Sequence, residues 1–423
     1  MQNRQPALGF IFVTLVLDIL GIGLLIPIVP KLIESFAGDI SSASSTSAWL
    51  SASFALMNFV FAPILGSLSD KLGRRPVILA SLLGSGLDYL LLAFAPNLGW
   101  FFLGRIISGI TGASFSAATA YIADVSPPEK RAQNFGLIGA AFGLGFILGP
   151  LLGGLLSSYG LRVPFFVAAG LTLVNWLYGY FVLPESLKPQ NRREFSWARA
   201  NPIGSLLGLG RYPVVLGLVG SIFLANLAQN ALQNTWVFYT SFRYNWNARD
   251  VGISLAVVGL TAAIVQGGLV RQIVPRLGER RSIVIGLGIS AISFLLYGLA
   301  SQGWMIYVIL VFGSIGGIGG PATQGLISRS VAPNEQGALQ GSLSSLTSIV
   351  NLIGPLIFNN LFAFFTRQDA NPQIPGIAFY VSSGLLLGAL AISVAAFRNP
   401  AFNQSRRDAN AAAIEADQPP VTH

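Results

Sequence analysis

The ten residues GSLSDKLGRR, Gly66–Arg75, form a charged turn between two long apolar runs, and this arrangement decides the fold. The apolar runs, 48–68 and 77–95, are each long enough to cross ~30 Å of hydrocarbon as a helix. The turn must therefore lie at a membrane face. Its basic residues Lys71, Arg74 and Arg75 indicate the cytoplasmic face, because short cytoplasmic loops are enriched in lysine and arginine.

The composition of the whole chain supports the same conclusion. Hydrophobic side chains make up 53% of the 423 residues and charged ones only 10%, which is too apolar for a soluble globular protein. The net charge of +9 is spread over short loops, so we attribute it to membrane orientation and expect no nucleic acid partner. Cysteine is absent and the one histidine is His423. This excludes thiolate or imidazole catalysis and cysteine or histidine metal sites within the membrane. Because the sequence shows no nucleophile with a base, no metal cluster and no cofactor loop, we expect no catalytic residues, no metal site and no enzyme activity.

Twelve apolar runs of about 20 residues, the length that spans a bilayer, divide the chain. They lie near 7–30, 48–68, 77–95, 99–123, 134–157, 163–184, 213–239, 251–274, 282–301, 303–327, 338–365 and 376–397. The first run carries Asp18 and is too long for a cleavable signal, so we expect it to be retained. With both termini cytoplasmic, 19 of the 25 lysines and arginines fall in cytoplasmic segments and five in outer loops. This asymmetry predicts a multi-pass protein of the plasma or inner membrane in that orientation.

The longest connection, 185–212, is polar and basic and separates six spans from six. We predict an N-terminal six-helix bundle (1–184), a cytoplasmic linker (185–212) and a C-terminal six-helix bundle (213–397). The tail, 398–423, has no apolar face and is expected to be disordered and cytoplasmic. Gly73 recurs as Gly278 and Pro150 as Pro355, both 205 residues later, which indicates an internal duplication in parallel orientation.

With these motifs the chain resembles the major facilitator superfamily over essentially its full length. The Gly66–Arg75 turn is similar to that superfamily's motif between helices two and three. Arg105 followed by Gly109 and Gly112 resembles its fourth-span motif, and the glycines around Pro150 resemble a motif associated with antiporters. The resemblance implies an all-α fold of twelve transmembrane helices in two parallel-repeat bundles, which works by alternating access.

Within the superfamily the chain looks most like the drug/proton antiporters of the tetracycline efflux group. The similar stretches are DILGIGLLIP (18–27), ALMNFVFAP (55–63), LDYLLLAFA (87–95), LGRIISGITGA (103–113), FGLIGAAFGLGFILGP (135–150) and QGALQGSLSSLT (336–347). Tetracycline exporters carry a histidine in helix eight and an aspartate in helix nine that take part in proton coupling. Ala262 and Ser290 occupy the corresponding positions here, so the resemblance leaves open whether tetracycline is the substrate.

Three ionisable residues lie well inside the predicted spans: Asp18, Asp88 and Arg105. Such residues are costly in a membrane and mark functional sites by default. We predict that Asp18 and Asp88 exchange protons and that Arg105, which a tight turn brings near Asp88, tunes whichever carboxylate it approaches. The alternative is a static pair of Asp88 and Arg105 that locks two helices together.

The seventh span carries five carboxamides on one helical face, at i, i+3, i+4, i+7 and i+8. That face cannot meet lipid, where polar groups lack partners, so we predict that it lines a substrate cavity. The alternative is hydrogen bonding between neighbouring helices. The predicted cavity residues are Asn58, Asn226, Gln229, Asn230, Gln233, Asn234, Trp236, Gln266 and Gln324.

Two further groups complete the predicted sites. A cytoplasmic gate is expected at Gly66, Asp70, Gly73, Arg74, Arg75, Asp124 and Arg131. Close helix packing in the fifth span is expected at Gly145, Gly149, Pro150 and Gly153, because small residues let helix backbones approach. Gly317–Pro321 is expected to interrupt the tenth span.

The combined prediction is a secondary active transporter and not an enzyme. Proton-coupled export of a small amphipathic compound, tetracycline-like or multidrug, is the favoured function. The alternative is a proton symporter or facilitator that imports a small metabolite. We expect no cofactor other than the proton gradient as energy source, the substrate, protons and the lipid bilayer as partners, and a monomer.

Overall fold

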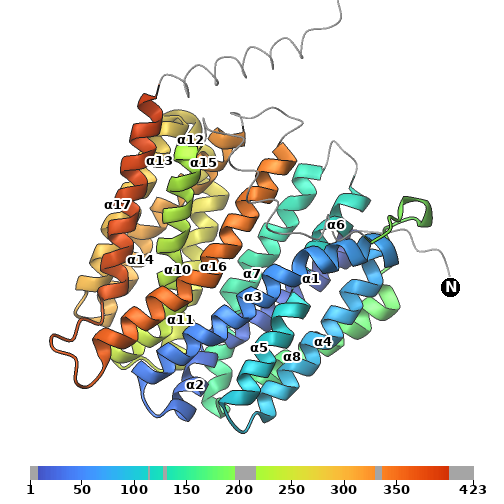
Figure 1. The fold of residues 1–423 in the computed structure, drawn as a ribbon, viewed down its shortest axis with the longest axis horizontal. Coiled ribbons are helices and arrows are strands. Elements are labelled where there is room, and N and C mark those ends of the chain that lie inside the picture. The colour runs from blue at the N-terminus through green and yellow to red at the C-terminus, as the bar shows by residue number, and fades with distance from the viewer. Residues whose placement is uncertain (1–7, 113–114, 127–130, 196–215, 329–335, 400–423) are drawn as a thin grey trace, which may run out of the picture. The chain divides into compact units, whose positions relative to one another are not determined.

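A computed structural model describes residues 8–112, 115–126, 131–195, 216–328 and 336–399 (Figure 1). Within these ranges every regular element is a helix, which confirms the all-α prediction. Residues 196–212 of the predicted linker (185–212) and residues 400–423 of the predicted tail (398–423) lie outside the described ranges. So do 113–114, 127–130 and 329–335.

The first half of the chain contains the predicted spans one to six. Its helices are α1 (Leu8–Leu25), α2 (Val29–Ala37), α3 (Ile40–Leu72), α4 (Arg74–Phe94), α5 (Leu98–Gly112), α6 (Phe115–Val125), α7 (Arg131–Leu156) and α8 (Val163–Val182). A short 3-10 turn, Ser157–Tyr159, follows α7, and another, Pro189–Asn191, follows α8. Pro27 lies in the break between α1 and α2, where its missing N–H interrupts the helical hydrogen bonds.

The second half contains the remaining six spans. Its helices are α10 (Leu216–Tyr244), α11 (Ala248–Ile264), α12 (Val270–Leu277), α13 (Glu279–Leu299), α14 (Gly303–Ser314), α15 (Gly319–Ser328), α16 (Gln336–Thr366) and α17 (Ile377–Arg398). A π-helical segment, Val265–Leu269, joins α11 to α12. A 3-10 segment, Ile315–Ile318, joins α14 to α15, so the interruption predicted at Gly317–Pro321 begins slightly earlier.

Length and apolarity alone identify 11 membrane-spanning helices among the described residues. The helix left out is α10, although its 29 residues extend ~44 Å at 1.5 Å per residue and are long enough to cross a membrane. Its carboxamide face lowers its mean hydropathy. The polar face that predicts a site in this span thus also makes α10 too polar to be identified as membrane-spanning from its hydropathy.

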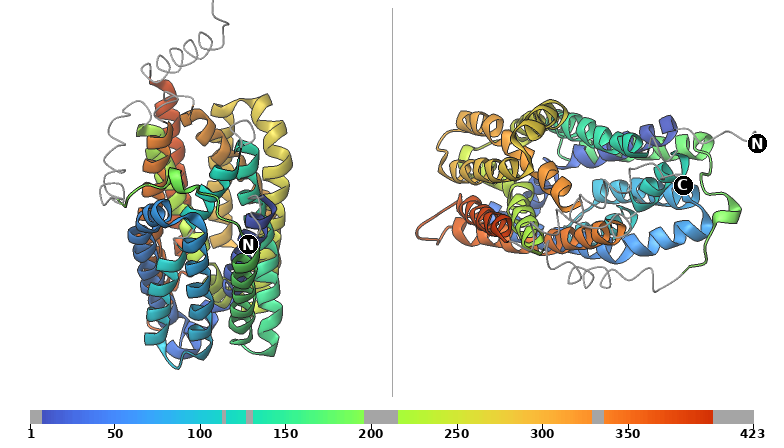
Figure 2. Two further views of the ribbon diagram at one scale, coloured as in Figure 1. Left: turned by 90° about the vertical axis from the view of Figure 1, so that its right-hand side faces the viewer. Right: turned by 90° about the horizontal axis from the view of Figure 1, so that it is seen from above.

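The internal duplication is visible in local geometry. Gly73 ends α3 with φ +108° and Gly278 ends α12 with φ +79°, and a 21-residue helix follows each of them. The arginines two residues after these glycines also have similar surroundings, because each lies over an aromatic ring. The Arg75 guanidinium lies 5.9 Å from the Tyr180 ring centre, and that of Arg280 lies 5.5 Å from the Phe397 ring centre. Figure 2 shows further views of helices that pack together, α4 with α8 and α13 with α17.

The contacts divide the chain into two compact units that differ from the two sequence halves. Unit 1 comprises 1–202, 234–260 and 351–375, and unit 2 comprises 203–233, 261–350 and 376–423. Three of the five boundaries fall inside helices, namely α10, α11 and α16. Each unit has its own buried core, which includes Ile11, Tyr121 and Ile122 in unit 1 and Ile283, Leu326 and Leu339 in unit 2.

Glycines bring α7 into close contact with α1 in unit 1. A Cβ atom built on Gly149 would lie 2.6 Å from the Cα of Gly23, and one on Gly153 would lie 2.8 Å from the carbonyl carbon of Leu24. Gly145 meets Ile19 in the same way. No side chain fits at these positions, so the two helix backbones approach as small residues allow in membranes.

We predict that Gly149→Val destabilises the protein by about 1–3 kcal/mol, because an added side chain forces α1 and α7 apart. Thermal unfolding of the purified protein in detergent measures this. Gly143→Val is the matched control on the same helix, since a Cβ there has no other atom within 4 Å. Equal melting temperatures for the two variants would contradict the packing argument.

Candidate functional site

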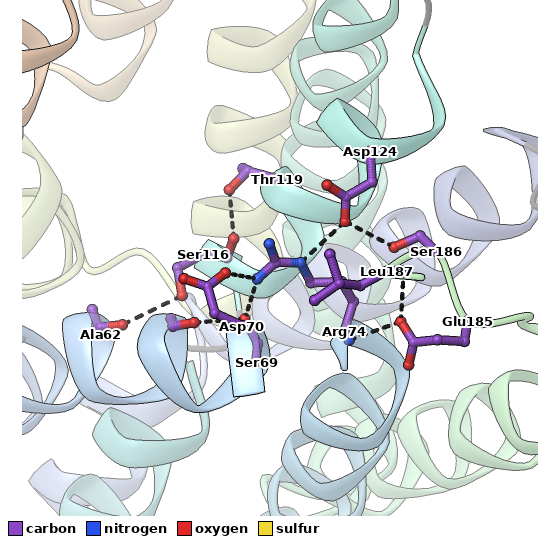
Figure 3. Close-up of polar contacts among 11 residues, drawn as sticks. Ala62, Ser69, Asp70, Arg74, Ser116, Thr119, Asp124, Glu185, Ser186 and Leu187 are labelled. Carbon is purple, nitrogen blue, oxygen red and sulfur yellow. Dashed lines mark hydrogen bonds and ion pairs between the residues drawn. The ribbon is translucent and has the colours of Figure 1, made fainter. Parts of the chain in front are cut away.

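Arg74, the first residue of α4, is the centre of a polar cluster that joins α3, α4 and α6 (Figure 3). The residue is only 8% exposed. Its Nη1 lies 2.6 Å from Asp70 Oδ1 and donates to Ser69 Oγ at 2.6 Å, while its Nε donates to Asp124 Oδ2 at 3.1 Å. A buried guanidinium requires such partners, because an unpaired charge is costly away from water.

Glu185 completes this cluster, although sequence reasoning did not identify it. Its carboxylate accepts the backbone N–H groups of Arg74 at 2.9 Å, Arg75 at 3.2 Å and Leu187 at 3.0 Å. Two of these donors belong to the first turn of α4, which has no helical acceptors and favours a negative charge. A Cβ on Gly73 would collide with the Glu185 carboxylate. Gly73 therefore provides both the positive φ and the space for the acid.

The other predicted gate residues surround the same turn. Asp124 Oδ2 also accepts from Ser186 Oγ at 3.1 Å, and Arg75 Nη2 donates to the carbonyl of Tyr180. The carbonyl of Gly66 accepts from Ser69 Oγ at 2.8 Å. The side chain of Arg131 lies outside the described part of the structure. The cluster thus links α3, α4, α6 and the segment after α8, all within unit 1.

Asp88 and Arg105 are brought together by a residue that the sequence did not indicate, Ser108. Asp88 is 1% exposed and accepts a hydrogen bond from Ser108 Oγ, while Arg105 Nη2 lies 3.4 Å from the same hydroxyl. The second carboxylate oxygen, Asp88 Oδ1, has no hydrogen-bond partner. Ser108 could have been found from its position, because it lies three residues after Arg105 and so on the same helical face.

Asp18 lies in the middle of α1, on a different helix from Asp88. The Tyr89 ring packs against the same helix three residues further on, since a Cβ on Gly21 would lie 3.6 Å from it. Tyr89 directly follows Asp88 in α4, so this contact joins the helices that carry Asp18 and Asp88 within unit 1.

The carboxamides of α10 have different surroundings in the structure. Asn226 and Gln229 line a cavity in unit 2, Asn230 is buried, Gln233 is exposed and Asn234 is half-buried. Asn226 and Gln229 belong to unit 2 and Asn234 belongs to unit 1. The five carboxamides therefore do not share one local environment.

The remaining predicted cavity residues are spread over both units. Trp236 is buried and donates to Ser254 Oγ at 3.1 Å, and Asn58 Nδ2 donates to the carbonyl of Gly109 at 3.4 Å. Gln266 is exposed and lies beside Gly317 in unit 2. Gln324 lines the same cavity as Asn226 and Gln229.

The cavity in unit 2 has a volume of about 420 Å³ and is formed by α10, α13, α15, α16 and their neighbours. Further polar groups also line it, namely Ser221, Ser290, Thr323, Gln340, Ser344 and Thr347. Three of them lie at i, i+4 and i+7 of α16, a spacing that places them on one face. That periodicity was available in the sequence.

Among the described residues, no group of three or more histidine, cysteine, aspartate or glutamate side chains could hold a metal ion. The polar groups of the interior are instead the cluster of Asp88, Ser108 and Arg105 and a cavity lined by amides and hydroxyls. An all-helical membrane protein with an interior of this kind is typical of transporters of small molecules.

The chain belongs to the Major Facilitator Superfamily, whose family profile matches residues 11–355 and 272–419. This confirms the resemblance and the twelve-helix fold class. It is 41% identical to the tetracycline resistance protein, class C, of Escherichia coli over 92% of this chain and 96% of that protein. Identity to the class G protein of Vibrio anguillarum is 40%, over 82% and 88% of the two chains.

Solved structures show the same fold. The human organic anion transporter MFSD10 has a TM-score of 0.68 and 26% identity, and the alignment covers 92% of this chain and all of that one. The nucleoside transporter NupG has a TM-score of 0.74 at 13% identity, with 93% and 99% covered. The second likeness concerns the fold alone.

We predict that Arg74→Lys destabilises the protein by about 1.5–3 kcal/mol, since lysine keeps the charge but loses a charge-assisted hydrogen bond to Asp70 or Asp124. Thermal unfolding in detergent measures the loss. Lys71→Arg, an exposed position in the same turn, serves as the control. If both exchanges have the same small effect, the planar geometry of Arg74 is unimportant.

Proposed function

We propose that this transporter exports a small amphipathic compound, tetracycline-like or multidrug, from the cytoplasm in exchange for protons. The proton gradient is the energy source, and no cofactor is needed. In this proposal the protein acts as a monomer in the plasma or inner membrane with both termini cytoplasmic. The sequence similarity to tetracycline resistance proteins supports the substrate class.

The observation that carries the coupling proposal is the cluster of Asp88, Ser108 and Arg105. Burial of Asp88 disfavours its negative charge, whereas the Ser108 hydroxyl and the nearby guanidinium stabilise it. Because the two effects oppose each other, a small change in geometry changes whether the carboxylate holds a proton. Asp88 Oδ1, which has no hydrogen-bond partner, is the atom that would accept it.

Contacts inside unit 1 support alternating access. Ser41 Oγ donates to the carbonyl of Ala363 at 2.6 Å, Ser44 Oγ to that of Asn359 at 3.0 Å, and Ser45 Oγ to Asn360 Oδ1 at 2.7 Å. These bonds join the start of α3 to the end of α16, and therefore the first and second halves of the chain. Water can replace hydroxyl hydrogen bonds when the helices separate, so this end is suited to open and close.

In the transport cycle we assign the moving bodies to 1–184 and 213–397, connected by 185–212, with 398–423 as the tail. The Arg74 cluster lies at the opposite end of α3 from the serines and consists of residues of 1–184 together with Glu185 and Ser186 at the start of the connection. It would hold the cytoplasmic ends of α3, α4 and α6 together as one body while the other end opens.

The alternative is a symporter or facilitator that imports a small metabolite. It is favoured by Ser290, a neutral residue of the unit 2 cavity at the position where the tetracycline group has an aspartate. Direction can be tested directly. Substrate accumulation by everted vesicles whose lumen is more acidic than the medium supports export. Substrate uptake by right-side-out vesicles in a medium more acidic than the lumen supports symport.

We predict that Asp88→Asn and Asp18→Asn each abolish proton-driven drug accumulation in everted vesicles, because an amide cannot exchange the proton. The measurement is drug uptake together with the pH change of the vesicle lumen.

Asp369→Asn is the control, since Asp369 is a largely exposed residue that pairs with Arg367 at 3.7 Å. Full coupling in both single variants and in the double variant would show that neither carboxylate carries the proton. Coupling lost only in Asp88→Asn would restrict the role to the Ser108 cluster.

A further inference from the structure

The side chains that line the unit 2 cavity within the described part of the chain are uncharged. They belong to 18 residues, of which none is a lysine, arginine, aspartate or glutamate. Four are carboxamides, Asn226, Gln229, Gln324 and Gln340, and five carry hydroxyl groups. The ionisable residues of the membrane interior, Asp18, Asp88 and Arg105, belong to unit 1 and are absent from this lining.

We propose that this cavity binds the substrate, and that it selects molecules without net charge that carry hydroxyl, carbonyl or amide groups on an apolar body. Organic cations and organic anions bind more weakly. The inference rests on the proposed export function and specifies its substrate class.

The electrostatic argument concerns the cost of removing charge from water. A bound ion loses part of its hydration, and a site repays this only with a countercharge or a dense set of oriented dipoles. Here the lining offers no countercharge. Carboxamides and hydroxyls both donate and accept hydrogen bonds, so they satisfy neutral polar groups of either kind.

The apolar part of the lining accounts for the body of the ligand. Ile222, Leu287, Leu343 and Leu386 face the same space as the amides. A volume of about 420 Å³ is within the range of small-molecule pockets, roughly 300–1,000 Å³. The cavity therefore fits a compact amphipath better than a peptide or an inorganic ion.

Glycines determine the shape of the cavity wall. Gly286 packs directly on the backbone of Gly316 and Gly319, where a Cβ would lie 2.7–2.8 Å from backbone atoms. Gly320 lines the cavity and has nothing within 4 Å of a built Cβ. A larger side chain at Gly320 therefore enters the cavity without displacing the protein.

Three molecules that share one scaffold but differ in net charge test the proposal. Chloramphenicol is uncharged and has an amide and two hydroxyls, its deacylated amine is a cation at neutral pH, and its succinate ester is an anion. We measure the binding of each to the purified full-length protein in lipid nanodiscs. We expect chloramphenicol to bind at least about tenfold more tightly than either charged relative, a difference of about 1.4 kcal/mol.

Substitutions place the ligand in the cavity. Gly320→Leu is expected to weaken chloramphenicol binding about tenfold or more, whereas Gly384→Leu, on an exposed α17 position outside the lining with equal free space, leaves it unchanged. Ser290→Asp adds a carboxylate to the lining and is expected to reverse the preference in favour of the amine.

The results separate this inference from the proposed function. Failure of chloramphenicol to bind, equal or tighter binding of a charged relative, or unchanged binding by Gly320→Leu overturns the inference. Proton release on chloramphenicol addition to proteoliposomes is measured separately. Selective binding without proton exchange would overturn the antiport proposal and leave the neutral cavity in place.

Discussion

A polar group inside a membrane protein must find a partner within the protein or face water, because hydrocarbon offers none. The main features of this structure satisfy that constraint. Arg74 is surrounded by Ser69, Asp70 and Asp124, and the Glu185 carboxylate accepts the first N–H groups of α4. Around Asn226 and Gln229 of α10, a cavity provides room for water or ligand.

The two sequence halves satisfy this constraint with different chemistry. The first half contains the ionisable groups of the membrane interior. There Asp88 accepts a hydrogen bond from Ser108, whose hydroxyl also contacts Arg105. The second half contributes the neutral amides and hydroxyls around the unit 2 cavity. The backbone turns at Gly73 and Gly278 are alike, but Pro275 in the second copy replaces Asp70, so the Arg74–Asp70 pair has no equivalent there. In the proposed function this difference separates proton exchange from substrate binding.

Periodicity predicted the fold well because each span is specified locally. The turn at Gly66–Arg75, the run lengths and the repeat of Gly73 as Gly278 all concern neighbouring residues or equal offsets. Predictions of contacts between helices were less complete. The meeting of Asp88 with Arg105 was expected, but its mediator Ser108 was not, and Glu185 acts across 111 residues of sequence on the N–H of Arg74. A hydrogen bond of that separation leaves no local pattern.

The sequence by itself determined the class of protein, the number of spans and the motif residues, since these depend on hydrophobic length, on charge in short loops and on turn geometry. Only the tertiary structure decided which polar residues share a site. Five amides on one face of α10 look equivalent in sequence, yet only Asn226 and Gln229 line the unit 2 cavity, and they do so with residues from α15 and α16. The physical reason is that a helical face is set by 3.6-residue periodicity, whereas its neighbours are set by packing between distant segments.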